Sequence, residues 1–214
     1  MARERQIFCI GLSRTGTTSL HLALVALGYS AVHYPAQQAI KWLHGDFSSE
    51  TTQEYQAYSD VPTPVFFRDL HATHPDALFI YTRRDPDAWV DSVQRHIGKT
   101  SPPSQFTILR DYNRLATYGT LDFSRSRFLD TFYQHEERVN AHFRNEPDRL
   151  LTLDLDRNFT WAPLVEFLGV SPPPSDVGFP KAASPNIGRF AAVPDEQVAE
   201  RQRELLSKLG SAQP

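Results

Sequence analysis

The stretch IFCIGLSRTGTTSL, residues 7–20, decides the fold class of this chain. A short apolar run over 6–10 predicts a strand, which ends at Gly11. Over 17–27, leucines and alanines recur at helical spacing, and Gly28 stands where a C-terminal cap belongs. A strand that passes through a short glycine-containing loop into a helix is typical of a parallel α/β sheet.

The loop itself has the G-x-x-x-x-G spacing of a phosphate-binding loop, from Gly11 to Gly16. Glycines let successive N–H groups turn inward, and the start of the helix adds partial positive charge, so the loop favours an anion. A nucleotide triphosphatase continues with Lys-Ser or Lys-Thr, whereas this chain continues with Thr17 and Thr18. The nearest cation is Arg14. The loop therefore predicts a site for one phosphate-like group and does not support the usual ATP chemistry.

Outward from this loop, strands and helices alternate along the chain. Further strands are predicted over 30–34, 77–82 and 150–154, and further helices over 37–43, from 86, over 105–118, 126–144, 161–168 and 195–209. Residues 45–64 are polar and are interpreted as a loop with one short helix. The pattern predicts an α/β protein with a P-loop-type three-layer fold, in which helices flank a short central parallel sheet, and a single domain over 1–214.

Composition limits the possible functions. The 214 residues carry a net charge of −3 with no run of more than two basic residues, so a nucleic-acid-binding face is not expected. A single cysteine, Cys9, excludes an intrachain disulfide and a cysteine-based zinc site. The apolar run near the N-terminus is too short for a signal peptide or a membrane span. We expect a cytoplasmic protein with no membrane span.

A second informative stretch is YTRRDPDAWVDS, residues 81–92. Asp85 and Pro86 predict the first residues of a helix, as N-cap and N1. Arg83 and Arg84 stand at the C-terminal end of the predicted strand, which is the edge where open α/β sheets bind ligands. An arginine there suits a phosphate, because its planar fork donates two hydrogen bonds at once.

Together these two stretches resemble the sulfotransferases that use 3′-phosphoadenosine-5′-phosphosulfate (PAPS). In that family a basic residue precedes a Ser/Thr/Gly-Gly-Thr-Thr/Ser run, matched here by Arg14 and 15–18, and an Arg with a Ser eight residues later holds the 3′-phosphate, matched by Arg84 and Ser92. The resemblance implies that PAPS, or its product adenosine 3′,5′-bisphosphate, is bound by Ser13, Arg14, Thr15, Gly16, Thr17, Thr18, Ser19, Arg84 and Ser92. Many members stack the adenine on an aromatic residue where this chain has Ser19.

A third stretch, residues 161–186, resembles one subgroup of these enzymes. A Trp-x-x-Leu-x-x-Phe-Leu-Gly helix leads through prolines to Phe179 and Pro180, and the asparagine that closes the subgroup's pattern is displaced to Asn186. By the same resemblance, a late polar cluster is expected to close over the 3′-phosphate. Its members are Lys181, Asn186, Gly188 and Arg189.

In-line sulfuryl transfer to a hydroxyl or amine needs charge stabilisation on the leaving phosphate and a base for the acceptor proton. Arg14 is predicted to stabilise that charge. The family commonly has its base about 20–25 residues before the 3′-phosphate arginine, and Asp60 lies 24 residues before Arg84, in an Asp-x-Pro that the subgroup shares. His33 and His71 remain alternative bases.

The acceptor is expected to be a small molecule, in a pocket formed by helical segments near 37–60 and 104–145. The sequence names neither this acceptor nor the oligomeric state. His71 and His74 have metal-ligand spacing, but Pro75 weakens a helix there, so no metal site is expected. Two alternative functions remain: a P-loop nucleotide kinase that uses magnesium and ATP, and a sulfotransferase-like protein that binds the nucleotide without catalysis.

Overall fold

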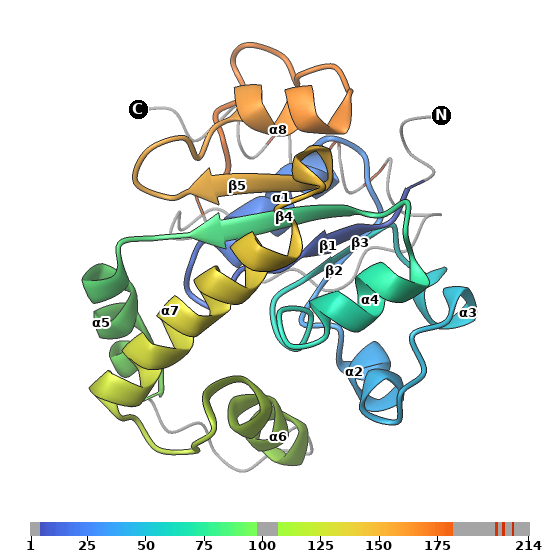
Figure 1. Cartoon of the computed structure of the whole chain (residues 1–214). Coiled ribbons are helices and arrows are strands. Elements are labelled where there is room, and N and C mark those ends of the chain that lie inside the picture. The colour runs from blue at the N-terminus through green and yellow to red at the C-terminus, as the bar shows by residue number, and fades with distance from the viewer. Residues whose placement is uncertain (1–4, 98–106, 182–199, 201–202, 204–206, 208–214) are drawn as a thin grey trace.

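A parallel sheet of five strands forms the centre of the computed structural model, which describes residues 5–97 and 107–181 together with 200, 203 and 207 (Figure 1). The strands are β1 (Ile7–Cys9), β2 (Ala31–His33), β3 (Ala57–Ser59), β4 (Leu78–Arg83) and β5 (Leu150–Asp154). Their order across the sheet is β2-β3-β1-β4-β5, and every neighbouring pair is parallel. The predicted α/β fold with a short central parallel sheet between helices is confirmed.

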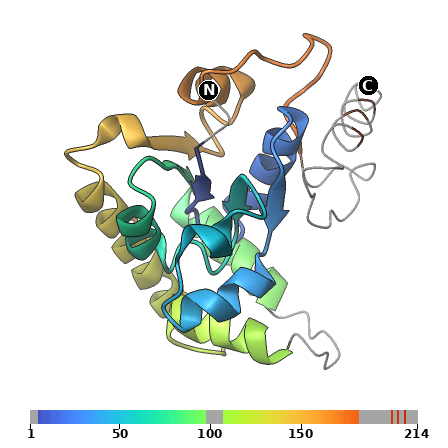
Figure 2. The ribbon, with the colours of Figure 1, turned by 90° about the vertical axis from the view of Figure 1, so that its right-hand side faces the viewer.

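Eight helices are present in the described part of the chain. They are α1 (Thr17–Ala26), α2 (Ala36–Leu43), α3 (Ser49–Thr52), α4 (Phe67–Thr73), α5 (Pro86–Ile97), α6 (Thr107–Tyr118), α7 (Arg125–His142) and α8 (Trp161–Leu168), with one 3₁₀ turn at Pro147–Arg149. Helices α1 and α8 cover one face of the sheet, whereas α2, α4 and α7 cover the other. Figure 2 shows α1 and α7 on opposite sides of the strands.

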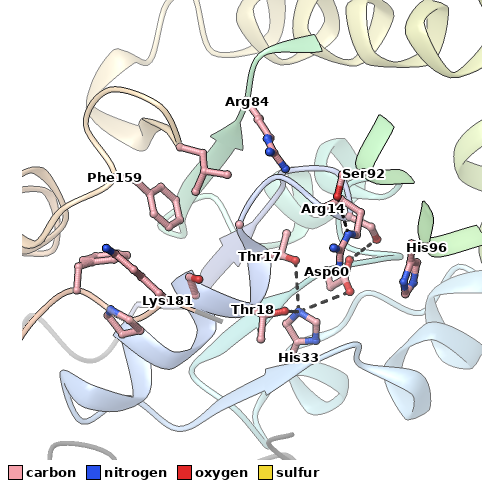
Figure 3. A pocket seen from close by; sticks show the side chains of 16 residues that line it. Arg14, Thr17, Thr18, His33, Asp60, Arg84, Ser92, His96, Phe159 and Lys181 are labelled. Carbon is pink, nitrogen blue, oxygen red and sulfur yellow. Dashed lines mark hydrogen bonds and ion pairs between the residues drawn. The ribbon is translucent and has the colours of Figure 1, made fainter. Parts of the chain in front are cut away.

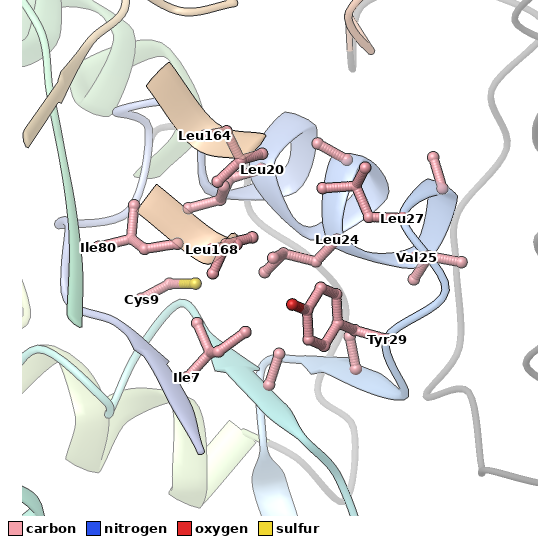
Figure 4. Packing of buried hydrophobic residues seen from close by; sticks show 14 of the residues in the cluster. Ile7, Cys9, Leu20, Leu24, Val25, Leu27, Tyr29, Ile80, Leu164 and Leu168 are labelled. Carbon is pink, nitrogen blue, oxygen red and sulfur yellow. The ribbon is translucent and has the colours of Figure 1, made fainter. Parts of the chain in front are cut away.

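Side chains alternate along β1 and so contribute to two cores. Ile7 and Cys9 pack against the leucines of α1, while Phe8 and Ile10 pack under α4 and α7. In Figure 4 the first of these cores also contains Leu164 and Leu168 of α8. Almost every residue of α1 is buried, which fixes the helix rigidly against the sheet. The loop that leads into α1 therefore stands on a rigid base.

Two elements correct the sequence predictions. Residues 57–59, interpreted as part of a loop, form β3, because this segment lies between β1 and β2 and is buried on both faces. Helix α4 was not among the predicted helices: Pro75 was expected to weaken a helix around 71–74, whereas α4 includes His71 and ends at Thr73, two residues before the proline. The other predicted helices agree with the structure to within two residues where both are described.

Some predictions cannot be compared with the structure. The late polar residues Asn186, Gly188 and Arg189 lie outside the described residues, as does most of the tail helix predicted over 195–209. Within the described ranges, no helix combines the length and the hydropathy needed to cross a bilayer.

Candidate functional site

The loop between β1 and α1 needs glycine at both of its ends. Gly16 caps the helix with φ 100°, a left-handed conformation that glycine adopts without strain. A Cβ on Gly16 would also lie 2.8 Å from the ring of Phe159. A Cβ on Gly11 would collide with the side chain of Thr82 on β4. Glycine is therefore needed at Gly16 for its backbone angle and for close packing, and at Gly11 for close packing alone.

Thr15 braces this loop from inside. Its N–H donates to the Leu12 carbonyl, and its buried hydroxyl donates to the same carbonyl and lies 2.7 Å from the hydroxyl of Thr82. From the other side, the indole Nε1 of Trp89 donates to the Ser13 carbonyl at 2.9 Å. The polar groups of Thr15 are therefore occupied within the protein.

A cavity of about 530 Å³ opens beside the loop (Figure 3). The glycine and the polar residues that line it are Ser13, Arg14, Gly16, Thr17, Thr18, Ser19, His33, Asp60, Arg84, Ser92 and His96. Leu155, Phe159, Phe179, Pro180 and Lys181 complete the wall. The structure thus brings to one cavity all the donor-binding residues predicted from the first two stretches except Thr15, together with Asp60, His33 and Lys181.

His71, the third base considered from the sequence, does not line this cavity. It is buried on α4, where Nδ1 lies 2.9 Å from Nε2 of His142 and the ring stacks on Phe143. Because these contacts belong to the core under α4 and α7, His71 is excluded as a base for chemistry in this cavity.

The two neighbouring arginines at the end of β4 differ in their surroundings. Arg83 forms ion pairs with Glu136 at 2.6 Å and with Asp154 at 3.5 Å. Arg84 points into the cavity and forms no ion pair among the described residues (Figure 3). The buried Nε of each arginine lacks a hydrogen-bond partner there, but that of Arg83 lies beside Asp154, whereas that of Arg84 has no carboxylate near it. A buried donor without an acceptor is costly, so this position suits an anion.

Arg14 also lines the cavity, and its Nε donates to the Ser92 hydroxyl at 3.1 Å. Lys181 lines the same cavity from the segment that follows α8. With Arg84, these residues give the cavity three basic side chains, whereas Asp60 is the one carboxylate that lines it among the residues the structure describes. Such a balance favours a ligand with several negative charges.

Asp60 and His33 lie side by side where β3 and β2 end. Asp60 accepts a hydrogen bond from the Ser13 hydroxyl at 2.5 Å, and its second oxygen lies 3.6 Å from Nε2 of His33. That nitrogen is also 3.2 Å from the Thr18 hydroxyl and 3.3 Å from the Thr17 hydroxyl. The two candidate bases therefore form one hydrogen-bonded cluster with the loop.

Residues with strained backbone angles occur at the C-terminal edge of the sheet, where the cavities lie. Among the described residues, three that are not glycine have positive φ: Arg14 at 75°, Tyr34 at 64° and Asp60 at 69°. The left-handed conformation is uncommon for such residues and costs free energy. Each of the three turns the chain at the end of β1, β2 or β3 and brings a polar side chain to the cavities.

In the apolar part of the cavity, Leu155 and Phe159 were not predicted from the sequence, and Phe179 and Pro180 were named only as matches to the family pattern. Phe159 follows β5, and its ring lies edge-on to that of Phe179, with centroids 5.0 Å apart. Leu155 lies beside them. The sequence offered one weak signal, an aromatic residue shortly after the C-terminal end of a strand.

A smaller cavity of about 140 Å³ adjoins the first. The two share Ser13, Arg14, Asp60 and His96. The remaining lining comes from Tyr34, Val61, Val93, Arg110, Asn113, Arg114 and Tyr118. Part of this wall belongs to α6, within the segment 104–145 where an acceptor pocket was expected.

Burial governs the two tyrosines of the smaller cavity. Desolvation raises the pKa of Tyr118, and the nearby charge of Asp60 raises this pKa further. Desolvation also raises the pKa of Tyr34, partly offset by a hydrogen bond from Asn113. Both phenols are therefore neutral at physiological pH and can donate hydrogen bonds.

The arrangement offers cations, hydroxyls and backbone N–H groups to an anionic ligand and a carboxylate to a neighbouring one. No group of three or more His, Cys, Asp or Glu side chains suited to a metal ion occurs in the part of the chain that the structure describes.

Comparison with known proteins agrees with this geometry. A family model described as "Sulfotransferase domain" matches residues 6–186. A curated relative, "Ava biosynthesis cluster protein M" from Aspergillus versicolor, is 26% identical, and the match covers 76% of this chain and 75% of the relative. The matched region contains both cavities and all five strands.

Proposed function

Because the chain belongs to the sulfotransferase domain family, we propose that it transfers a sulfuryl group from PAPS to a hydroxyl or amine of a small acceptor. The larger cavity is the donor site in this proposal, and the smaller one is the acceptor site. Asp60 and Arg14 line both cavities, so a base and a cation lie where donor and acceptor would meet.

The observation that carries this proposal is the environment of Arg84. Its Nε is buried without a partner among the described residues, and the side chain points into a cavity that also holds Ser92. A guanidinium fork and a hydroxyl together suit a phosphate dianion. This combination supports a 3′-phosphate at this end of the cavity.

At the other end, the loop would hold the 5′-phosphosulfate. The N-terminus of α1 supplies N–H groups and partial positive charge, and Thr17 and Thr18 supply hydroxyls. Phe159 and Phe179 would contact the adenine, which compensates for the serine at position 19. Lys181 adds a third cation near this wall.

Asp60 is the proposed general base. It would accept the acceptor proton, while Arg14 would stabilise negative charge on the leaving phosphate. When bound, PAPS supplies the sulfuryl group: a bond from sulfur to the acceptor oxygen forms, and the bond from sulfur to the bridging phosphate oxygen breaks. Ser13 holds the carboxylate of Asp60 in place, and His33 lies beside it to receive or share the proton.

A thermal-shift experiment tests the donor. Adenosine 3′,5′-bisphosphate at 100 times its Kd should stabilise the protein by about 2.7 kcal/mol, which raises Tm by about 5–10 °C for a chain of this size. Arg84→Ala should remove most of this shift. Arg83→Ala is the matched control: it loses ion pairs and lowers Tm without ligand, but it should keep the ligand-induced shift.

The same experiment separates the alternatives. Stabilisation by ATP with magnesium and none by the bisphosphate would overturn the proposal in favour of a nucleotide kinase. Stabilisation by the bisphosphate without PAPS turnover on any acceptor would instead indicate a binding protein that lacks catalysis.

A further inference from the structure

Two arginines of the smaller cavity have no role in donor binding. Arg110 and Arg114 are four residues apart on α6 and therefore lie on the same face of this helix. Both line the smaller cavity, and neither lines the larger one. Their positive charge faces the volume that the proposed function reserves for the acceptor.

Neither arginine is neutralised strongly by the protein. Arg110 pairs through Nε with Asp111, the next residue, and both side chains are 34% exposed, so this ion pair is weak. Arg114 makes no ion pair with any carboxylate of the described residues. The cavity wall formed by α6 therefore carries positive charge that is available to a ligand.

Asn113 lies between these arginines in the sequence and adds an independent observation. It is 3% exposed, and its Nδ2 donates to the Tyr34 hydroxyl at 3.2 Å. Its Oδ1 is buried without a hydrogen-bond partner in the described part of the chain. A buried amide oxygen on a residue that lines a cavity, without a donor, indicates a ligand there with a hydrogen-bond donor such as a hydroxyl.

The two sides of the smaller cavity are lined by different kinds of residues. Asp60 and Arg14 form the wall that it shares with the larger cavity, while the α6 residues line the smaller cavity alone. Val61, Val93 and Tyr118 supply apolar surface in its lining. Its volume of about 140 Å³ is close to the ~150 Å³ of an engineered cavity that holds one benzene molecule.

We infer that the sulfuryl acceptor is a hydroxyl compound about the size of one ring. It carries an oxyanion group, which is either a carboxylate or a phosphate. This inference rests on the proposed function. Arg110 and Arg114 bind the oxyanion, and the acceptor hydroxyl faces Asp60. A cationic amine is repelled by the same arginines, which narrows the acceptor from hydroxyl or amine to hydroxyl.

A matched series of phenols tests the charge of the acceptor. The probes are 4-hydroxyphenylacetate, its neutral amide, tyramine as the cation and 4-hydroxybenzylphosphonate. Each is titrated by calorimetry into the protein saturated with adenosine 3′,5′-bisphosphate, so that binding is measured without turnover. At least one of the two anions should bind about tenfold or more tightly than the amide, and tyramine should bind most weakly.

Variants of α6 test whether its two arginines cause the preference for anionic phenols. In Arg110→Gln with Arg114→Gln, affinity for the anions should fall to that for the amide, while affinity for the amide and for the bisphosphate stays within about twofold. Arg127→Gln, an arginine of α7 that lines neither cavity, is the control and should retain the preference. Turnover of each phenol with PAPS provides a second readout.

The two proposals fail in different ways. Absence of bisphosphate binding and of PAPS turnover would reject the proposed function itself. The anionic acceptor would be overturned, and the proposed function would stand, if the protein binds the bisphosphate but shows equal or undetectable affinity for the anions and the amide. The same conclusion would follow if the preference for the anions over the amide survives the double substitution. Between the two anions, the tighter one identifies the oxyanion.

Discussion

The Nε of Arg14 donates a hydrogen bond to the hydroxyl of Ser92, 3.1 Å away, although the two residues are 78 positions apart. One belongs to the loop after β1 and the other to α5, so this bond joins the two stretches that carried the sequence argument. In the proposed function the same hydroxyl contacts the 3′-phosphate. Ser92 therefore connects Arg14, the cation proposed to act on the leaving phosphate, to the site proposed for the 3′-phosphate.

Ser92→Ala removes this coupling. We expect the Kd for adenosine 3′,5′-bisphosphate to rise about tenfold or more, because a hydrogen bond to a charged group contributes about 1.5–3 kcal/mol. Calorimetric titration measures the change. Ser126→Ala, an exposed serine of α7 outside both cavities, should leave the Kd unaltered. An unchanged Kd for Ser92→Ala would show that the hydroxyl does not contact the ligand.

Asp60→Asn separates catalysis from binding. Asparagine tolerates the left-handed backbone at this position, so the loop is preserved. We expect kcat to fall by about 10²–10⁴, with the bisphosphate-induced thermal shift retained. His33→Gln should reduce kcat less, since Nε2 lies 3.6 Å from the carboxylate and acts beside it. The reverse order of the two losses would make His33 the base.

Gly16→Ala tests the close packing between the loop and Phe159. The added Cβ meets both a strained φ of 100° and the Phe159 ring at 2.8 Å. Gly119→Ala has a comparable positive φ of 66° and open space around it, so it isolates the backbone cost of about 1 kcal/mol. In urea unfolding, Gly16→Ala should lose more stability than this control. Equal losses would mean that the ring moves aside freely.

His135 makes the fold sensitive to acid. Its ring is buried and its Nε2 lies 2.7 Å from the Ile10 carbonyl, and desolvation lowers its pKa from 6.5 to about 4. Above pH 6.5 neither state binds the proton. As pH falls from 6.5 to 4, His135 becomes protonated in the unfolded chain but stays neutral in the native state, so the free energy of unfolding falls by about 3 kcal/mol.

His135→Gln should flatten this part of the stability curve, while carboxylate titration at lower pH stays common to both proteins. Urea unfolding of wild type and variant at half-unit steps from pH 7 to 4 measures the difference. Parallel curves would show that the histidine becomes protonated in the native state as readily as in the unfolded chain.

Strand β3 illustrates how far the sequence predicted the fold. Most of the alternating strands and helices were predictable because short apolar runs, apolar residues at helical spacing and glycine or proline boundaries mark them locally. Ala57, Tyr58 and Ser59 form only a three-residue segment, with Gln56 before it and Asp60 after it. Such a segment becomes a strand because β1 and β2 pair with it on both sides, and this information lies in the tertiary structure.

The candidate site divides in the same way. Gly11, Gly16 and the hydroxyls between them could be predicted, because one contiguous loop must satisfy its own backbone angles and packing. Phe159 comes from a distant segment with only a weak local signal, and Arg110 and Arg114 have none, so the topology alone brings them to the cavities. His71 was a reasonable candidate base by residue type, and its position on α4 removed it.

The positive φ angles of Arg14, Tyr34 and Asp60 have a practical consequence for protein engineering. Glycine at any of these positions would relieve the backbone strain, yet each substitution would delete a side chain that lines a cavity, together with its hydrogen bond to Ser92, Asn113 or Ser13. The strained backbone at these three positions is therefore kept for the side chains, and an engineer who relaxes it with glycine loses the residues that line the cavities.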